Sequence, residues 1–138
     1  MADLFADTSG WANLVDPSQS FHSMTADIYR SARNQSRRML TTNYVLTELV
    51  ALMTSPLRFP RAKMIAFIES LKTSPYIEVL HVDAGLDEEA WQLLKSRQDK
   101  EWSLVDCASF VVMRRRKLVE ALTTDHHFEQ AGFVRALK

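Results

Sequence analysis

The chain has 138 residues, its 17 basic and 17 acidic side chains cancel to a formal net charge of zero, and 46% of its residues are hydrophobic. This composition is typical of one soluble globular domain, which we expect to span 1–138. The neutral balance excludes a protein that binds nucleic acid by bulk charge alone. The apolar runs are too short to cross a membrane, and the first residues lack the pattern of a signal peptide. Because Cys107 is the single cysteine, no internal disulfide can form, and we expect a cytoplasmic protein.

The first half of the chain predicts two short strands and four helices. Pro17 ends the first helix, and Pro56 and Pro60 bracket a loop before the fourth. Apolar residues recur at helical spacing in the third helix, as at Val45 and Leu49. In chain order we expect a strand over 2–6, a helix over 9–15, a helix over about 21–34, a strand over 39–42, a helix over 44–54 and a helix over 61–73.

The second half predicts three more strands that alternate with three more helices. Asp83 or Asp87 can start the first of these helices, and Ser103 is placed to cap the second. The expected elements are a strand over 77–82, a helix from 83 or 87, a helix after 103, a strand over 119–123, a short helix over 126–131 ended by Gly132, and a strand over 133–137. Strands that alternate with helices predict a three-layer α/β/α sandwich around a mostly parallel sheet.

Four acidic residues stand where this fold would bring them together. Two of them close apolar runs that read as strands, and two lie inside apolar helical stretches, where a charge is costly unless it is compensated. Ligand sites in parallel sheets lie beyond the carboxyl ends of the strands, so all four can converge on one sheet edge. Four gathered carboxylates would repel one another unless a divalent cation such as Mg²⁺ or Mn²⁺ lies between them. These residues are Asp7, Glu48, Asp106 and Asp125.

Each of the four also has an ordinary structural explanation, which the sequence leaves open. Asp7 and Asp125 can cap the short helices that follow them, and Glu48 can pair with an arginine. Ser103 and Asp106 form a Ser-x-x-Asp capping pattern worth on the order of 1 kcal/mol. A capping role does not exclude a functional one, because a helix N-terminus also favours negative charge.

Neighbouring residues extend the predicted site. We expect Thr8, Ser103 and Asp99 to orient the carboxylates, although a solvated loop position for Asp99 is an open alternative. His126 and His127 suggest a metal site. However, the chain has no second His or Cys cluster at zinc spacing, so surface histidines, or one that contacts substrate, are favoured over zinc ligands.

Four segments of the chain resemble the motifs of PIN-domain ribonucleases. The match runs from about Leu4 to Phe133, and the chain length also suits the VapC-type toxins of bacterial toxin–antitoxin pairs. The third and fourth segments together are the more specific ones. In chain order the segments are Phe5-Ala6-Asp7-Thr8-Ser9-Gly10-Trp11, then 42–48, then 99–110, and finally 122–128 followed by Gly132-Phe133.

This resemblance implies a parallel α/β/α fold and an Mg²⁺- or Mn²⁺-dependent endoribonuclease that cleaves RNA. The family's acidic quartet falls on the four acids named above, all of which are retained. Such proteins are often homodimers inhibited by a small antitoxin protein. The basic stretch at a predicted helix C-terminus offers phosphate contacts from Arg114, Arg115 and Arg116, although these cations can equally complement the helix dipole.

Other functions remain compatible with parts of the pattern. A housekeeping RNA-processing nuclease would share the acidic quartet, and a non-catalytic RNA- or protein-binding module would share the fold. A phosphoacceptor receiver domain is disfavoured, because Asp3 and Asp7 are not an adjacent acidic pair and no lysine follows the late strand at Thr123-Thr124.

Overall fold

The computed structural model describes residues 3–138 and contains a five-stranded sheet in the order β3-β2-β1-β4-β5. Every neighbouring pair of strands is parallel, with Leu4 opposite Met39 and Phe5 opposite Ala121. The expected parallel sheet is therefore confirmed. The strands are β1 (Leu4–Ala6), β2 (Met39–Thr42), β3 (Ile77–Leu80), β4 (Glu120–Leu122) and β5 (Val134–Arg135).

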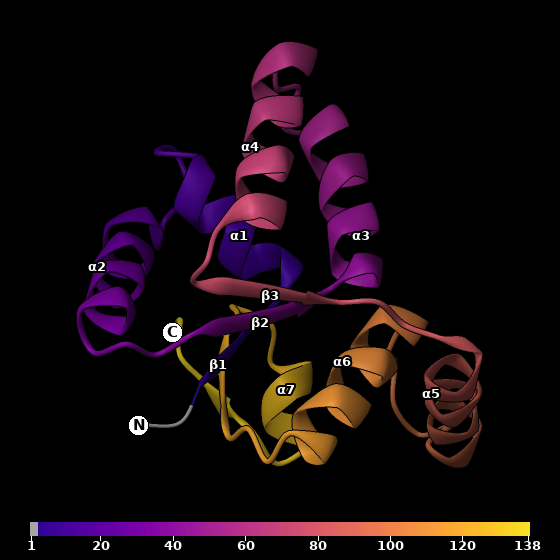
Figure 1. Cartoon of the computed structure of the whole chain (residues 1–138). Helices are drawn as coiled ribbons and strands as arrows, with labels where there is room; N and C mark the ends of the chain where they lie inside the picture. Colours follow the sequence, from indigo (N-terminus) through magenta and orange to yellow (C-terminus); the bar gives the residue numbers. More distant parts are fainter. Residues whose placement is uncertain (1–2) are drawn as a thin grey trace.

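Helices cover both faces of the sheet and give the three layers. Figure 1 shows α1, α3 and α4 on one side of the strands, with α5, α6 and α7 on the other. The helices are α1 (Thr8–Val15), α2 (His22–Asn34), α3 (Asn43–Thr54), α4 (Arg61–Thr73), α5 (Ala84–Ser96), α6 (Leu104–Arg115) and α7 (His127–Gln130). None of the helices in the described part of the chain is long and apolar enough to cross a membrane.

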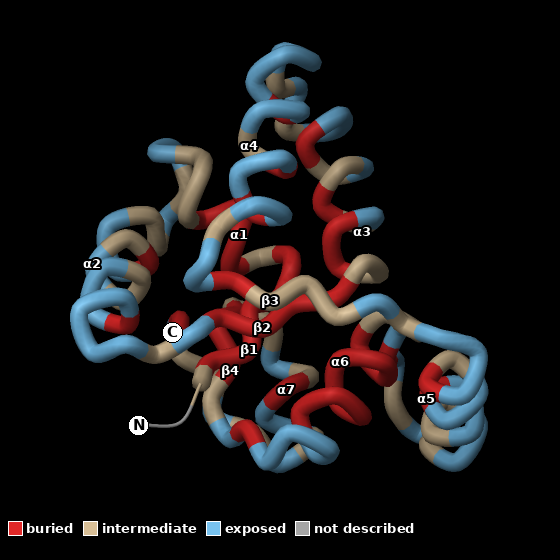
Figure 2. Tube along the Cα trace, in the orientation of Figure 1, coloured by how far each residue is buried: buried red, intermediate tan, exposed pale blue. Residues whose placement is uncertain are grey.

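The core follows the central strands and α6. All residues of β1 and β2 are buried, as expected for parallel strands covered on both faces. In α6 every residue from Asp106 to Met113 is buried, because this helix lies between the sheet and α5. Figure 2 shows this concentration of buried residues, whereas α4 and α5 turn exposed faces outward. Asp7, directly after β1, and Asp106, on α6, therefore adjoin fully buried segments of the core.

The strand and helix bounds agree closely with the sequence expectation in the first half of the chain. Met39–Thr42 and Arg61–Thr73 are confirmed residue for residue. Ala2, which was included in the first expected strand, lies outside the described residues. The helix after β3 begins behind Asp83 and not Asp87, because the Asp83 side chain accepts a hydrogen bond of 2.8 Å from the Leu86 N–H.

The last elements are shorter than expected. The strand over 119–123 is reduced to Glu120–Leu122, and the strand over 133–137 to Val134–Arg135. Beyond Leu122 one backbone bond to the segment after β5 remains, from the Leu137 N–H to the Thr123 carbonyl (3.2 Å). The Thr124 N–H donates to Ser9 Oγ (2.9 Å) and the Asp125 N–H to Thr123 Oγ1 (3.0 Å). Side-chain hydroxyls thus end β4 and turn the chain toward the candidate site.

Candidate active site

All four predicted acidic residues lie at the carboxyl edge of the sheet. Asp7 directly follows β1, Glu48 lies in the second turn of α3, and Asp106 is the third residue of α6. Asp125 follows β4 by three residues. A hollow of about 350 Å³ opens here, lined by Asp7, Thr8, Ser9, Glu48, Leu52, Thr124 and Asp125.

Asp7 is the most deeply placed carboxylate, with only 4% of the residue exposed. Its Oδ2 accepts a hydrogen bond of 3.1 Å from Thr123 Oγ1, whereas its Oδ1 is buried without a hydrogen-bond partner among the described residues. Burial, with smaller contributions from the nearby charges of Asp106 and Glu48, raises the pKa of Asp7 to about 7. Asp7 precedes α1 but makes no side-chain capping bond, so capping does not explain it.

Glu48 is held beside Asp7 through a hydroxyl group. Thr8 Oγ1 donates a hydrogen bond of 2.5 Å to Glu48 Oε1. The start of α3 is fixed by Thr42, whose side chain accepts a hydrogen bond of 3.1 Å from the Val45 N–H. The alternative that Glu48 pairs with an arginine is not found, since no ion pair to Glu48 occurs within residues 3–138. Thr8 is therefore placed to orient the carboxylate of Glu48, as was expected for a residue that supports the site.

Asp106 caps the start of α6 and also lies near the other acidic residues. It forms a capping box with Ser103: Ser103 Oγ accepts from the Asp106 N–H (3.0 Å), and Asp106 Oδ2 accepts from the Ser103 N–H (3.1 Å). The same Oδ2 lies 3.1 Å from Nδ1 of His127. Burial raises the pKa of Asp106, and the charge of Asp125 adds to this effect. The expected cap is confirmed, and it points the carboxylate at the other acids.

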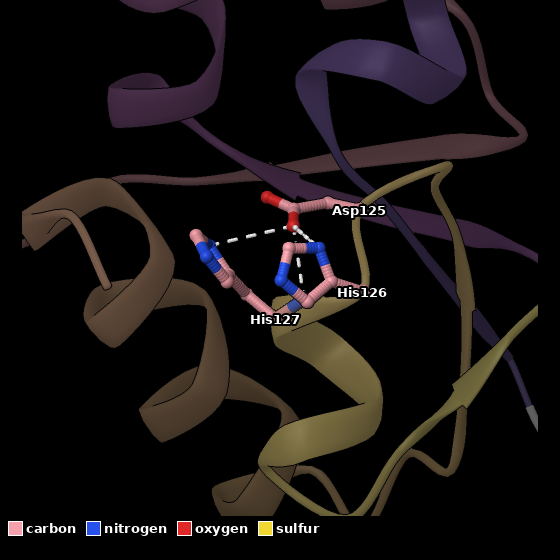
Figure 3. Close-up of side chains that lie close together, drawn as sticks. All are labelled: Asp125, His126 and His127. Atoms are coloured by element: carbon pink, nitrogen blue, oxygen red, sulfur yellow. Dashed lines mark hydrogen bonds and ion pairs between the residues drawn. The ribbon is translucent and has the colours of Figure 1, made fainter. Parts of the chain in front are cut away.

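Asp125 is fixed by the first turn of α7. Its Oδ1 accepts a hydrogen bond of 2.9 Å from the His127 N–H, so it satisfies a helix N-terminus as the capping alternative proposed. Both neighbouring histidines turn toward this carboxylate, as Figure 3 shows. The Nδ1 atoms of His127 and His126 lie 3.4 and 3.8 Å from Asp125 Oδ1.

Two hydroxyl residues join the ends of β1 and β4: Ser9, which the sequence offered as a cap or as a partner of Asp7, and Thr123, which was not expected at the site. Thr123 Oγ1 donates to Asp7 and accepts from the Asp125 N–H, so a single hydroxyl links two of the acids. Ser9 Oγ lies 3.1 Å from the same Thr123 Oγ1. Both residues lie near predicted strand ends and inside the first and last motif segments, but their contact spans 114 residues.

The structure does not bring Asp99 to the acidic group. Its carboxylate is exposed and accepts hydrogen bonds of 2.9 and 3.0 Å from Arg97, which lower its pKa to about 2. Asp99 precedes Ser103 by four residues, but these residues form a turn and an extended connection and not a helical turn. The solvated alternative is the one that the structure supports.

The basic stretch that was expected to contact RNA lies at the far end of α6. Asp106 stands in the first turn of this helix, whereas Arg114 and Arg115 end it, so they are displaced along its axis by about 12 Å or more. Arg115 pairs with Glu89, and Arg116 hydrogen-bonds to Glu78, both at the exposed surface. These arginines therefore lie away from the carboxyl edge of the sheet.

The comparison with known families agrees with this architecture. A family model for the PIN domain matches residues 4–134. The chain is a member of the PIN-domain family. This PIN domain is 33% identical over 131 residues to the 23S rRNA-specific endonuclease VapC20 of Mycobacterium tuberculosis, and the match covers 95% of each chain.

Solved structures extend the comparison to three dimensions. The crystal structure of VapC20 from Mycobacterium tuberculosis, described as a sarcin-ricin loop cleaving toxin, superposes on this PIN domain with a TM-score of 0.85 and 30% identity. The superposition covers 99% of this chain and 100% of that one. FitAcB from Neisseria gonorrhoeae matches with a TM-score of 0.63 and 18% identity over 98% of this chain and 95% of that one, a likeness in fold alone.

Proposed function

We propose that this PIN domain is a divalent-metal-dependent endoribonuclease that hydrolyses RNA phosphodiester bonds as the toxin of a type II toxin–antitoxin pair. One observation carries the proposal. Asp7, which has a buried carboxylate oxygen without a hydrogen-bond partner among the described residues, lines a hollow together with Glu48 and Asp125. The likeness to VapC20, an endonuclease, covers nearly the whole chain and supports the same conclusion.

The donor set fits Mg²⁺ or Mn²⁺. The residues that would hold the ion are Asp7, Glu48, Asp106 and Asp125. Carboxylate oxygens are the ligands that such hard cations prefer. The raised pKa values of Asp7 and Asp106 reflect the burial and crowding of negative charge, which a cation would relieve. When bound, the ion would supply positive charge to the scissile phosphate and lower the pKa of the attacking water.

The chain's hydroxyl groups would hold the carboxylates in place. The Thr8 hydroxyl fixes the carboxylate of Glu48, and the Thr123 hydroxyl fixes that of Asp7. The carboxylate of Asp106 is held by the backbone N–H of Ser103, whose hydroxyl accepts from the Asp106 N–H in return. A preorganised set of this kind needs no rearrangement during the reaction, which is the main protein contribution in phosphoryl chemistry.

The substrate and partners follow from the relatives. Because VapC20 is named for 23S rRNA, we propose ribosomal RNA as the first substrate to test, with the protein acting in the cytoplasm. We further propose a cognate antitoxin, whose C-terminal segment would place a basic side chain near the acidic hollow, and a homodimer in solution. Growth arrest on expression, relieved by the product of a neighbouring antitoxin gene, would distinguish the toxin role from that of a housekeeping nuclease.

The activity is tested by incubating the purified protein with 23S rRNA in Mg²⁺, Mn²⁺ or EDTA and mapping the RNA ends. We expect discrete cleavage with a divalent metal, none in EDTA, and a loss of at least about a hundredfold in Asp7→Asn and Asp106→Asn. Asp99→Asn is the matched control, since it removes an exposed carboxylate outside the site. Cleavage of equal rate in Asp7→Asn and the wild type would refute the assignment, and metal-independent binding without cleavage would favour an RNA-binding module.

A further inference from the structure

We propose that Asp125, His126 and His127 form a divalent-cation position with mixed nitrogen and oxygen ligands at the rim of the acidic site. This position differs in chemistry from the all-oxygen set of Asp7 and Glu48. The inference rests on the proposed function only for its location beside the nuclease site, and it can fail or hold separately.

The three ligand atoms are already close together. Nδ1 of His127 and Nδ1 of His126 lie 3.4 and 3.8 Å from Asp125 Oδ1. One potential ligand atom from each of the three residues lies within 4.8 Å of the other two. Ligands bound at about 2.1 Å to a single ion are separated from each other by about 3 to 4 Å. Within residues 3–138 no other three His, Cys, Asp or Glu side chains meet this criterion, and this includes any three of the acidic quartet.

The start of α7 builds this arrangement. The His127 N–H holds Asp125 Oδ1 at 2.9 Å, which fixes the carboxylate above the first helical turn. The two imidazole rings have centroids 4.6 Å apart and are tilted by 53°. Figure 3 shows both rings turned toward the same carboxylate, although side chains of consecutive residues usually diverge. His127 also approaches Asp106 Oδ2 at 3.1 Å, which connects the position to the acidic group.

The surroundings of His126 give it no other structural task. Its side chain is 64% exposed, its ring lies against Asp125 and His127, and its charge also acts on Glu129. An exposed pair of this kind contributes little to stability. The approach of two imidazole rings to one carboxylate oxygen is better explained by a cation that all three side chains bind than by packing.

The ligand types decide which ions the position would accept. Imidazole nitrogen suits first-row transition ions, whereas Mg²⁺ prefers oxygen ligands in near-octahedral geometry. We therefore assign the position to an ion such as Mn²⁺, Co²⁺ or Zn²⁺. The neighbouring Asp7 and Glu48 offer oxygen only and remain suited to Mg²⁺.

Pulsed electron paramagnetic resonance of bound Mn²⁺ tests the assignment directly, because it detects nitrogen nuclei coordinated to the ion. The measurement uses the full chain without a histidine tag, loaded with Mn²⁺ at stoichiometric concentration. We expect nitrogen modulation in the wild type and its loss in the double variant His126→Ala/His127→Ala. Mn²⁺ affinity in that variant should fall at least about tenfold, while Mg²⁺ affinity changes little. His81→Ala is the control, since this exposed histidine lies outside the site.

Each outcome decides the inference. Mn²⁺ that binds the wild type without nitrogen modulation would overturn it, and so would modulation that persists unchanged in a double variant with a native circular dichroism spectrum. In the first case RNA cleavage by the wild type would leave the proposed function standing. Conversely, nitrogen modulation in a protein that cleaves no RNA with any divalent metal would support the cation position while the proposed function fails.

Discussion

At the scale of single residues, Asp7 carries the largest electrostatic cost in the acidic group. The folded protein buries its carboxylate without a partner for Oδ1, and burial raises its pKa to about 7. Such a group destabilises the fold in its charged form unless a positive charge comes near. If the proposed metal binds, Asp7 is therefore the site residue that we expect it to stabilise most.

The titration of Asp7 predicts how stability depends on pH in EDTA. Because the folded pKa, about 7, lies above the unfolded value of 3.8, the folded state holds a proton that the unfolded chain releases. Stability is then unaffected below about pH 4 and declines as the pH rises to about 7, by at most about 4 kcal/mol. Urea unfolding between pH 4 and 8 measures this decline, and Asp7→Asn should make it shallower.

Two comparisons sharpen the experiment. Asp99→Asn should keep the wild-type slope, because the pKa of Asp99 is already lowered to about 2 and its titration lies below this pH window. In the wild type at pH 8, saturating Mn²⁺ should restore the stability that is lost in EDTA, because the ion binds only the folded state. A slope that is the same in Asp7→Asn and the wild type would show that Asp7 does not titrate in this window.

The hydroxyl of Thr8 supports a second prediction at this scale. It donates a 2.5 Å hydrogen bond to Glu48, so Thr8→Val should release the carboxylate with almost no change in volume. We expect RNA cleavage to fall about tenfold, mainly through weaker metal binding, while Thr8→Ser retains activity. Isothermal titration with Mn²⁺ together with cleavage rates measures both effects.

Thr47→Val provides the matched control. Thr47 is exposed on the same helix, and its hydroxyl donates to the backbone carbonyl of Asn43. Its loss should leave metal affinity and cleavage unchanged. If Thr8→Val binds Mn²⁺ and cleaves RNA as the wild type does, Thr8 has no role in orienting Glu48.

At the scale of elements, helix starts and strand ends position the site. Thr42 caps α3, Ser103 caps α6, and Asp125 serves the first turn of α7. The sequence allowed the Ser103 cap to be predicted because capping depends on a short local pattern. The hydroxyl contact between Ser9 and Thr123 could not be predicted in this way, because it joins residues that only the closed sheet brings together.

The contact between α1 and β4 predicts a strong effect at Gly10. A Cβ atom at this position would lie 2.2 Å from the carbonyl oxygen of Leu122, which is backbone and cannot move aside cheaply. Gly10→Ala should therefore lower the free energy of unfolding by about 2 to 3 kcal/mol. It should also disturb Asp7, whose N–H donates to the same Leu122 carbonyl. Chemical denaturation measures the first effect and Mn²⁺ affinity the second.

Gly85→Ala separates this clash from a general effect of replacing glycine in a helix. Gly85 lies in the first turn of α5, and a Cβ there would be 3.6 Å from Asp83 Oδ1, an ordinary contact. The alanine should be neutral or stabilising by up to about 1 kcal/mol. Equal stability of the two variants would mean that α1 can shift away from β4 at little cost.

At the scale of the whole molecule, the alternation of strands and helices determined both the fold and the convergence of the acids. Parallel strands end at one edge, so residues after β1 and β4 had to meet there. The same rule accounts for the position of the basic stretch. A helix that begins at the site with Asp106 must carry its C-terminal Arg114 away from it. Charge and composition alone did not indicate which end of the helix faces the acids. The single-domain extent of 1–138 stays a prediction.

The direction of α6 leads to a prediction for the triple variant Arg114→Ala/Arg115→Ala/Arg116→Ala. These side chains are exposed, and two of them pair with Glu89 and Glu78 on the surface. Their separation from Asp106, about 12 Å or more along the helix, exceeds the screening length of about 8 Å at physiological salt. Cleavage of a short RNA that spans only the acidic hollow should therefore stay within about twofold of the wild type. A loss of tenfold or more would show that the RNA path reaches the far end of α6, as the sequence first suggested, and repeating the assay with a longer RNA would map that path.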